Sequence, residues 1–147
     1  MRVVLQRVSR ARVLSGGETV GQIGPGLVLL LGVARGDDIA AAERLARRIV
    51  RLRVFEGDDG RFDRSLLDTG GEALVVSQFT LLADSRRQKG TRPDFSHAAP
   101  GEQAEPLYEQ FCQALRALGV AVETGTFGAR MDVELVNDGP VTLVLDL

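Results

Sequence analysis

The sequence has little of the chemistry on which most enzyme sites are built. Its 147 residues include one cysteine, Cys112, one histidine, His97, and no tryptophan. A lone cysteine cannot form a disulfide within the chain, and it fits a reducing compartment. One histidine and one cysteine are too few for a zinc site, so we expect neither a metal nor a cofactor. We expect Cys112 to pack in the core and His97 to lie on the surface.

Long hydrophobic runs are absent as well. The longest, residues 27–33, is far shorter than the ~20 residues that cross a bilayer. Gln6 and Arg7 interrupt the apolar residues at the N-terminus, so no signal peptide is recognisable. These features predict a cytoplasmic protein with no membrane contact. The formal net charge of −2 also lacks the basic excess of a general nucleic-acid binder, so any RNA contact must be local.

The first third of the chain, in contrast, is dense in β-strand signals. Gly16-Gly17 and residues 24–26 separate apolar runs, which favours antiparallel neighbours joined by short turns. The last of these runs is apolar throughout, as expected of a strand that is covered on both faces. The predicted strands are residues 3–8, 11–15, 18–23 and 26–33.

Helical periodicity appears twice in the remainder. Apolar residues recur every three or four positions over residues 39–52, directly after Asp37 and Asp38, which can cap a helix. A second helix is predicted at 107–118, where Gly119 ends it. We expect a strand at 73–82, a long surface loop at 85–106, and strands at 120–125, 131–137 and 140–146. The sequence therefore predicts one α+β domain over residues 1–147, with a mostly antiparallel, barrel-like sheet covered by two helices.

Phosphate-loop, dinucleotide and zinc-protease signatures are missing, and the candidates for chemistry are two polar insertions in apolar strands. Ser77, Gln78 and Thr80 interrupt the strand at 73–82. If the strand continues through them, Ser77 and Phe79 point to one face while Gln78 and Thr80 point to the other. The second insertion is residues 137–142, around Gly139-Pro140. By itself it predicts a hairpin turn between two strands.

Together the two insertions resemble the signature motifs of the D-aminoacyl-tRNA deacylases. "SQFTL" at 77–81 is similar to the first motif and "NDGPVT" at 137–142 to the second. The likeness extends over nearly the whole chain. It includes "LQRVSRARV" near the start, "GTRPDF" at 90–95 and "GTFGARM" at 125–131.

The resemblance implies a homodimeric, metal-independent hydrolase that cleaves the ester between a D-amino acid and the terminal adenosine of tRNA, and that also clears mischarged glycyl-tRNA. It implies active sites at the subunit interface, where the first motif of one protomer lines the pocket and Gly139-Pro140 of the other, with a cis peptide bond, reaches in. Backbone carbonyls there accept from the substrate ammonium group and exclude an L side chain.

For catalysis, we expect N–H groups near Phe79 and Thr80 to stabilise the oxyanion, with Thr80 positioning the attacking group and the tRNA 2′-hydroxyl assisting. Ser77 and Gln78 complete the first motif. The resemblance extends the substrate-binding set to Asn137, Val141, Thr142, Met131 and Phe127.

Four positive charges in seven residues of the long loop are candidates for contact with tRNA phosphates. Arg7, within the first strand, is interpreted as a partner in an internal ion pair at the dimer interface. Two other readings remain open: a non-enzymatic, β-rich dimeric binding module, and a serine hydrolase that uses Ser77 on a small ester. The four candidate tRNA contacts are Arg86, Arg87, Lys89 and Arg92.

Overall fold

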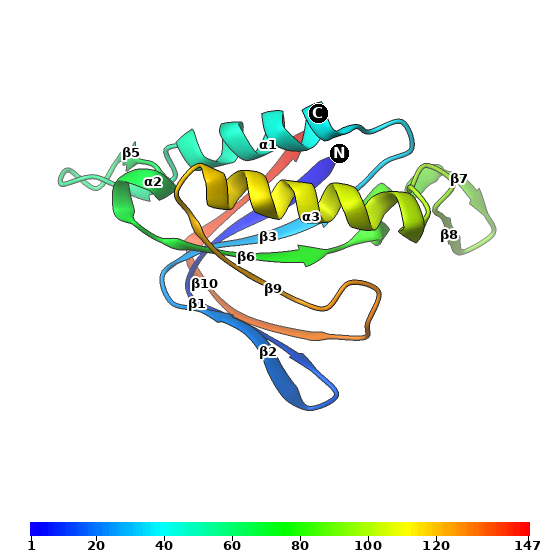
Figure 1. Cartoon of the computed structure of the whole chain (residues 1–147), viewed down its shortest axis with the longest axis horizontal. Helices are drawn as coiled ribbons and strands as arrows, with labels where there is room; N and C mark the ends of the chain where they lie inside the picture. The colour runs from blue at the N-terminus through cyan, green and yellow to red at the C-terminus, as the bar shows by residue number, and fades with distance from the viewer.

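A computed structural model of residues 1–147 shows the fold of the chain; it describes all of these residues except the side chains of Gln88 and Lys89. Figure 1 shows a curved sheet with helices on one side. The strands are β1 (Arg2–Ser15), β2 (Glu18–Ile23), β3 (Gly26–Gly32), β4 (Phe55–Glu56), β5 (Phe62–Arg64), β6 (Glu72–Ser77), β7 (Asp84–Lys89), β8 (Arg92–Asp94), β9 (Ala121–Thr124) and β10 (Asp132–Asp146). The helices are α1 (Ile39–Arg51), α2 (Leu66–Thr69) and α3 (Gly101–Ala117), with a 3₁₀ turn η1 (Phe79–Leu82).

The main sheet has the order β10-β1-β3-β6-β9, and β2 also pairs with β1. The pairings of β1 with β10, β2 and β3 are antiparallel, whereas β3–β6 and β6–β9 are parallel. The sheet is therefore mixed: three of its five pairings are antiparallel, in line with the expectation of a mostly antiparallel sheet, and two are parallel. The reason lies in the connections. The segments that contain α1 and α3 each carry the chain back to the end of the sheet where the preceding strand began, so the strands that they join run parallel.

The first strand is longer than predicted. Residues 3–8 and 11–15 are parts of one strand, β1, which bends at register irregularities near Val8. Its first half pairs with β3 and its second half pairs with β2. β2 then lies close to β9. The closeness is evident at Gly21, where an added Cβ would stand 2.3 Å from the Thr124 carbonyl oxygen. The sheet thus curls into a nearly closed barrel.

The two long helices lie side by side over one face of the sheet (Figure 1). α1 begins where predicted, because the Asp38 carboxylate accepts a hydrogen bond from Ala41 N at 2.8 Å. α3 begins at Gly101, six residues before the predicted start, and contains Pro106. Pro106 lies in the second turn, where its missing N–H removes the bond that residue 106 would donate to Glu102 O, and the helix continues past it. The short α2, which begins with a capping box at Ser65, is an addition to the predicted helices.

Two apolar clusters stabilise this arrangement. The larger lies between the sheet and the helices and includes Leu5, Leu29, Leu45 and Phe111, all fully buried. The smaller fills the inside of the curled sheet with residues such as Val28 and Leu74. β3 contributes to both clusters, which confirms that this strand is covered on both faces.

Candidate active site

The first motif marks the end of a strand. β6 stops at Ser77, and residues 79–82 form the 3₁₀ turn η1, so the prediction of a strand to residue 82 was wrong. Leu81 N donates to Gln78 O at 3.2 Å, and Ala83 N donates to Thr80 O at 3.2 Å. Within the described residues, the N–H groups of Phe79 and Thr80 donate to no protein acceptor. The turn therefore leaves two adjacent backbone donors free at the end of a buried strand.

Neighbouring elements hold this turn in place. Gln78 N donates to Leu31 O of β3 at 2.8 Å, and its side chain donates to the Thr80 hydroxyl. The exposed Phe79 ring meets Phe95 edge to face, with ring centroids 5.1 Å apart. β3 has a glycine here, Gly32, because a Cβ at this position would clash with a Leu82 methyl group at 2.2 Å.

A cavity of about 480 Å³ opens beside the turn. The start of α3 and the 125–131 loop complete its walls, and its lining is largely apolar with backbone and side-chain polar groups from the first motif. Thr80 lies next to it through its bond with Gln78, but does not line it. Of the predicted site residues, the cavity brings together Ser77, Gln78, Phe79, Phe127 and Met131.

The second motif is a bulge in a continuous strand. β10 runs without a break from Asp132 to Asp146, so the prediction of a hairpin turn was wrong. Asn137 pairs with Val8 of β1 and Thr142 pairs with Gln6, which leaves residues 138–141 opposite Arg7 alone. The bulge projects Gly139 and Pro140 into solvent. The peptide bond between them is cis, as the resemblance implied.

Side chains close the neck of this bulge. The Asn137 amide donates to Arg7 O at 2.9 Å and to Val141 O at 3.0 Å, and the Thr142 hydroxyl donates to Asn137 Oδ1 at 3.2 Å. Gln6 donates to the same hydroxyl at 3.2 Å. Val141 turns its side chain into the core, so only its backbone faces the bulge. Asn137 and Thr142 therefore shape the bulge from its base.

Arg7 supports the bulge from below, a role that goes beyond the ion pair expected for it. Its side chain is 5% exposed, and Nε donates to Asp138 O at 3.2 Å and lies 3.3 Å from the Asp138 carboxylate. Nη1 donates to Val54 O at 2.9 Å, while Glu56 lies 3.7 Å from Nη2. The expected ion pair within the chain is thus confirmed, while its place at a dimer interface stays a prediction. An arginine in the middle of an apolar strand was the signal that could have linked it to the bulge.

The two motifs lie far apart within one chain. Along β3, the partner of Ser77 is Leu31 and the partner of Arg7 is Leu27, and the bulge on β10 is three strands from β6. At about 3.3 Å per residue and about 4.8 Å per strand, the separation is on the order of 20 Å. Among the described residues, none of the second motif lines the cavity beside the first motif.

The predicted tRNA-contacting residues lie on a hairpin, where a loop was expected. β7 and β8 form a two-stranded ribbon next to the first motif, and Arg86, Arg87 and Arg92 are exposed on it. Arg87 lies 3.8 Å from Asp84, which also pairs with His97 at 3.3 Å. A hydrogen bond from Arg86 N is the main cause of the lowered pKa of Asp84. The side chain of Lys89 lies outside the described residues.

Two side chains of α3, Tyr108 and Cys112, are buried behind the cavity, and neither was assigned to the site from the sequence. The Tyr108 hydroxyl of α3 donates to Val75 O of β6 at 2.7 Å, and its ring packs on Phe127 at 5.7 Å between centroids. Burial raises the pKa of Tyr108. Cys112 is buried as expected, and burial raises the pKa of its thiol to about 11. The phenol and the thiol are thus neutral packing groups at physiological pH.

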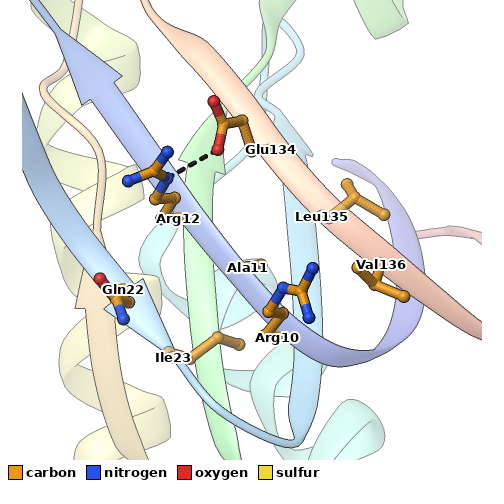
Figure 2. A pocket seen from close by; sticks show the side chains of 8 residues that line it. All are labelled: Arg10, Ala11, Arg12, Gln22, Ile23, Glu134, Leu135 and Val136. Carbon is orange, nitrogen blue, oxygen red and sulfur yellow. Dashed lines mark hydrogen bonds and ion pairs between the residues drawn. The ribbon is translucent and has the colours of Figure 1, made fainter. Parts of the chain in front are cut away.

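A separate hollow lies on the outer face of β1, β2 and β10 (Figure 2). Arg12 and Glu134 face each other across its rim with 2.6 Å between Nε and Oε2, while Arg10 and Val136 line the other end. It contains none of the predicted site residues.

Among the described residues, no three His, Cys, Asp or Glu side chains gather in a way that could hold a metal ion. None of the described helices is long and apolar enough to cross a membrane.

Comparison with known proteins points to the same family that the two motifs resemble. The family described as D-Tyr-tRNA(Tyr) deacylase matches residues 4–146. The chain belongs to this family. A D-aminoacyl-tRNA deacylase of Symbiobacterium thermophilum is 61% identical over 99% of this chain and 95% of its own length. One of Roseiflexus sp. (strain RS-1) is 62% identical over 99% of this chain and 93% of its own length.

A solved structure has the same fold. The protein titled "c-Myc DNA Unwinding Element Binding Protein" aligns with a TM-score of 0.93 at 43% identity, covering 100% of this chain and 99% of that one. Family membership therefore extends over the strands, the helices and both motifs.

Proposed function

We propose that this protein hydrolyses the ester bond of D-aminoacyl-tRNA and of mischarged glycyl-tRNA, releasing the free amino acid and tRNA. The observation that carries the proposal is the pairing of two motifs with opposite hydrogen-bonding character. The first motif offers free backbone N–H donors at a cavity, and the second offers backbone carbonyls on an exposed bulge. A tRNA substrate places this activity in the cytoplasm.

The N–H groups of Phe79 and Thr80 stabilise the oxyanion that forms when the ester carbonyl is attacked. Preorganised donors of this kind contribute about 3–4 kcal/mol each to the reaction barrier. The Thr80 hydroxyl, oriented by the Gln78 amide, positions the attacking group, and the ribose 2′-hydroxyl of the tRNA assists. Phe127 and Met131 form the apolar wall for the substrate. This chemistry uses backbone N–H groups, one side-chain hydroxyl and the substrate's own ribose, and it requires no metal or cofactor.

The carbonyls of Gly139 and Pro140 select the hand of the substrate. Among the side chains described, Arg7 bonds to Asp138 O and Asn137 to Val141 O, which leaves the two carbonyls between them without a side-chain donor. They accept from the substrate ammonium group and fill the space that an L side chain needs. Glycine has no side chain to clash, so it is accepted together with D-amino acids.

A second copy of the chain supplies this selecting bulge. The separation of roughly 20 Å between the motifs is too large for one chain to bring both to one substrate. A two-fold symmetric homodimer that exchanges its bulges gives two complete sites at the subunit interface. The dimer therefore follows from the requirement that both motifs act together.

Mixing two inactive variants tests the exchange. We expect Gly139→Ala and a Phe79→Pro variant, which lacks the N–H of residue 79, each to be inactive alone. After unfolding and refolding together, half of the dimers carry one intact site, so about a quarter of the wild-type activity returns. A mixture that stays inactive, although a tagged-partner pull-down shows heterodimers, contradicts the shared site.

The substrate itself is tested with matched D- and L-tyrosyl-tRNA and with glycyl-tRNA. We expect rapid hydrolysis of the D and glycyl esters and very slow hydrolysis of the L ester. Equal rates on both hands contradict selection by the bulge, and no turnover of any ester favours a binding module.

A serine hydrolase is the remaining alternative. The one histidine of the chain, His97, pairs with Asp84 and not with Ser77, so the geometry does not favour a nucleophilic serine. We expect Ser77→Ala to retain turnover and a fluorophosphonate to leave the protein unlabelled. Labelling at Ser77 with loss of activity contradicts the proposed mechanism.

A further inference from the structure

Arg2, near the start of β1, connects the end of the sheet to the first motif. Its Nη1 donates to Leu81 O in the turn η1 at 3.1 Å. Its other side binds the Asp146 carboxylate through two bonds, from Nε at 2.7 Å and from Nη2 at 3.2 Å. This forked pairing fixes the plane of the guanidinium group, so the third nitrogen is aimed at the turn.

A second ion pair joins the same two strands without touching either motif. Arg12 of β1 and Glu134 of β10 lie 2.6 Å apart at the rim of the hollow in Figure 2. The two pairs are similarly exposed, with side-chain exposures of 40% and 59% for Arg2 and Asp146 and 45% and 55% for Arg12 and Glu134. They differ in two respects: Arg2 makes two bonds to its carboxylate where Arg12 makes one, and only Arg2 also bonds to a backbone carbonyl of the first motif.

We propose that Arg2, held by Asp146, is a positioning residue that sets the orientation of the turn η1 and so of the N–H groups of Phe79 and Thr80. The inference rests on the proposed function, because it assigns those N–H groups to the oxyanion. It extends that function to a pair of residues at the two ends of the chain, well outside both motifs.

The connection from Arg2 to the reacting atoms is short. The turn is closed by the bonds from Leu81 N to Gln78 O and from Ala83 N to Thr80 O. The Leu81 carbonyl belongs to the peptide between Leu81 and Leu82, within the span of these two bonds, so holding it restrains the turn that carries the N–H groups of Phe79 and Thr80. On the opposite side, Leu82 packs against Gly32 of β3. When Arg2 is lost, packing still holds the Leu82 side of the turn, but no described group holds the Leu81 carbonyl.

The experiment compares Arg2→Met with Arg12→Met, both measured on D-tyrosyl-tRNA. Methionine keeps most of the apolar stem, so each variant loses one exposed ion pair between β1 and β10. We expect Arg2→Met to lower kcat about tenfold at unchanged KM, which is the loss of about one charge-assisted hydrogen bond in the transition state. We expect Arg12→Met to keep the wild-type kcat, with a similar small change in Tm.

Asp146→Asn sharpens the test. We expect a smaller decrease in kcat, because Arg2 remains but its fork is loosened. The double variant Arg2→Met/Asp146→Asn should be no slower than Arg2→Met alone, since the pair acts as one unit. If the decreases in kcat of the two single variants multiply in the double variant, Arg2 and Asp146 do not act as one unit.

Two other outcomes overturn the inference. If Arg2→Met changes KM and its salt dependence but not kcat, Arg2 is a contact for RNA phosphates, as its neighbour Arg86 is proposed to be. If Arg2→Met and Arg12→Met have the same kcat, the bond to Leu81 O does not position the turn. In both cases the wild type turns over D-tyrosyl-tRNA. Failure of the proposed function is distinguishable, because then the wild type itself shows no turnover.

Discussion

The turn η1 and the bulge at residues 138–141 are both polar interruptions of apolar strands, but they do opposite things to the backbone. At Ser77 the strand ends, and the turn exposes N–H groups beside a cavity. At Asn137 the strand continues on the far side of four unpaired residues, which carry carbonyls away from this chain's own cavity. The donors lie beside a cavity, and the acceptors lie on a projection. In the proposed dimer, the acceptors of one copy therefore meet the donors of the other.

The largest effect is expected at the tip of the projection. Gly139 has φ of +118°, and a Cβ there would lie 2.9 Å from Arg7 Nη2 and 3.0 Å from a Val141 methyl group. We expect Gly139→Ala to displace the bulge and lower kcat/KM for D-tyrosyl-tRNA about a hundredfold.

Gly17→Ala provides the matched control for this substitution. Gly17 also has a positive φ, +82°, but no atom lies within 4 Å of its added Cβ. The backbone cost is similar, so Tm should fall in both variants while activity falls only in Gly139→Ala. If both variants remain active, the shape of the bulge does not matter for catalysis.

A smaller effect is expected at the hydroxyl beside the cavity. Thr80→Ala removes the group that the Gln78 amide orients, so we expect kcat to fall about tenfold. Thr80→Ser keeps the hydroxyl and should retain most of the activity. Single-turnover rates measure both. Full activity in both variants restricts the role of the first motif to its backbone.

The basic hairpin should affect binding more than chemistry. Replacing Arg86 and Arg87 with glutamate should raise KM about fivefold at physiological salt and flatten its salt dependence, because each lost phosphate contact reduces the slope by ~0.7–0.9. Arg61→Glu is the control. Arg61 is exposed at the β4–β5 hairpin, at the opposite end of the molecule from β7 and β8 (Figure 1). Equal effects at both ends would indicate a general charge effect.

The smallest effect is expected at Cys112. The thiol reacts as a thiolate, and burial raises its pKa to about 11. Below that value the thiol is protonated, so about 0.1% is ionised at pH 8. Iodoacetamide at pH 8 should leave the folded protein unlabelled and fully active, as read by mass spectrometry and by the D-tyrosyl-tRNA assay. Fast labelling with inactivation would place a reactive thiol near the cavity.

Local pattern was sufficient for several elements. The start of α1 at Asp38, the turn at Gly16-Gly17 and the doubly covered β3 were predicted because their signals lie within the segments themselves. The start of α3 was missed because residues 85–106 have little hydrophobic periodicity, although the helix begins at Gly101 and continues past Pro106. The parallel pairings follow from the helices that connect β3 to β6 and β6 to β9.

The sequence by itself determined the candidate residues, since both motifs were identified by polar side chains placed where apolar strands were expected. Only the tertiary structure decided what each motif is. Whether residues 137–142 turn back or bulge depends on β1, more than 120 positions earlier, which pairs with both halves of β10. Whether Ser77 ends a strand depends on its neighbours β3 and Arg2. Hydrogen bonds between segments so far apart in the chain are set by packing, and no local pattern contains them.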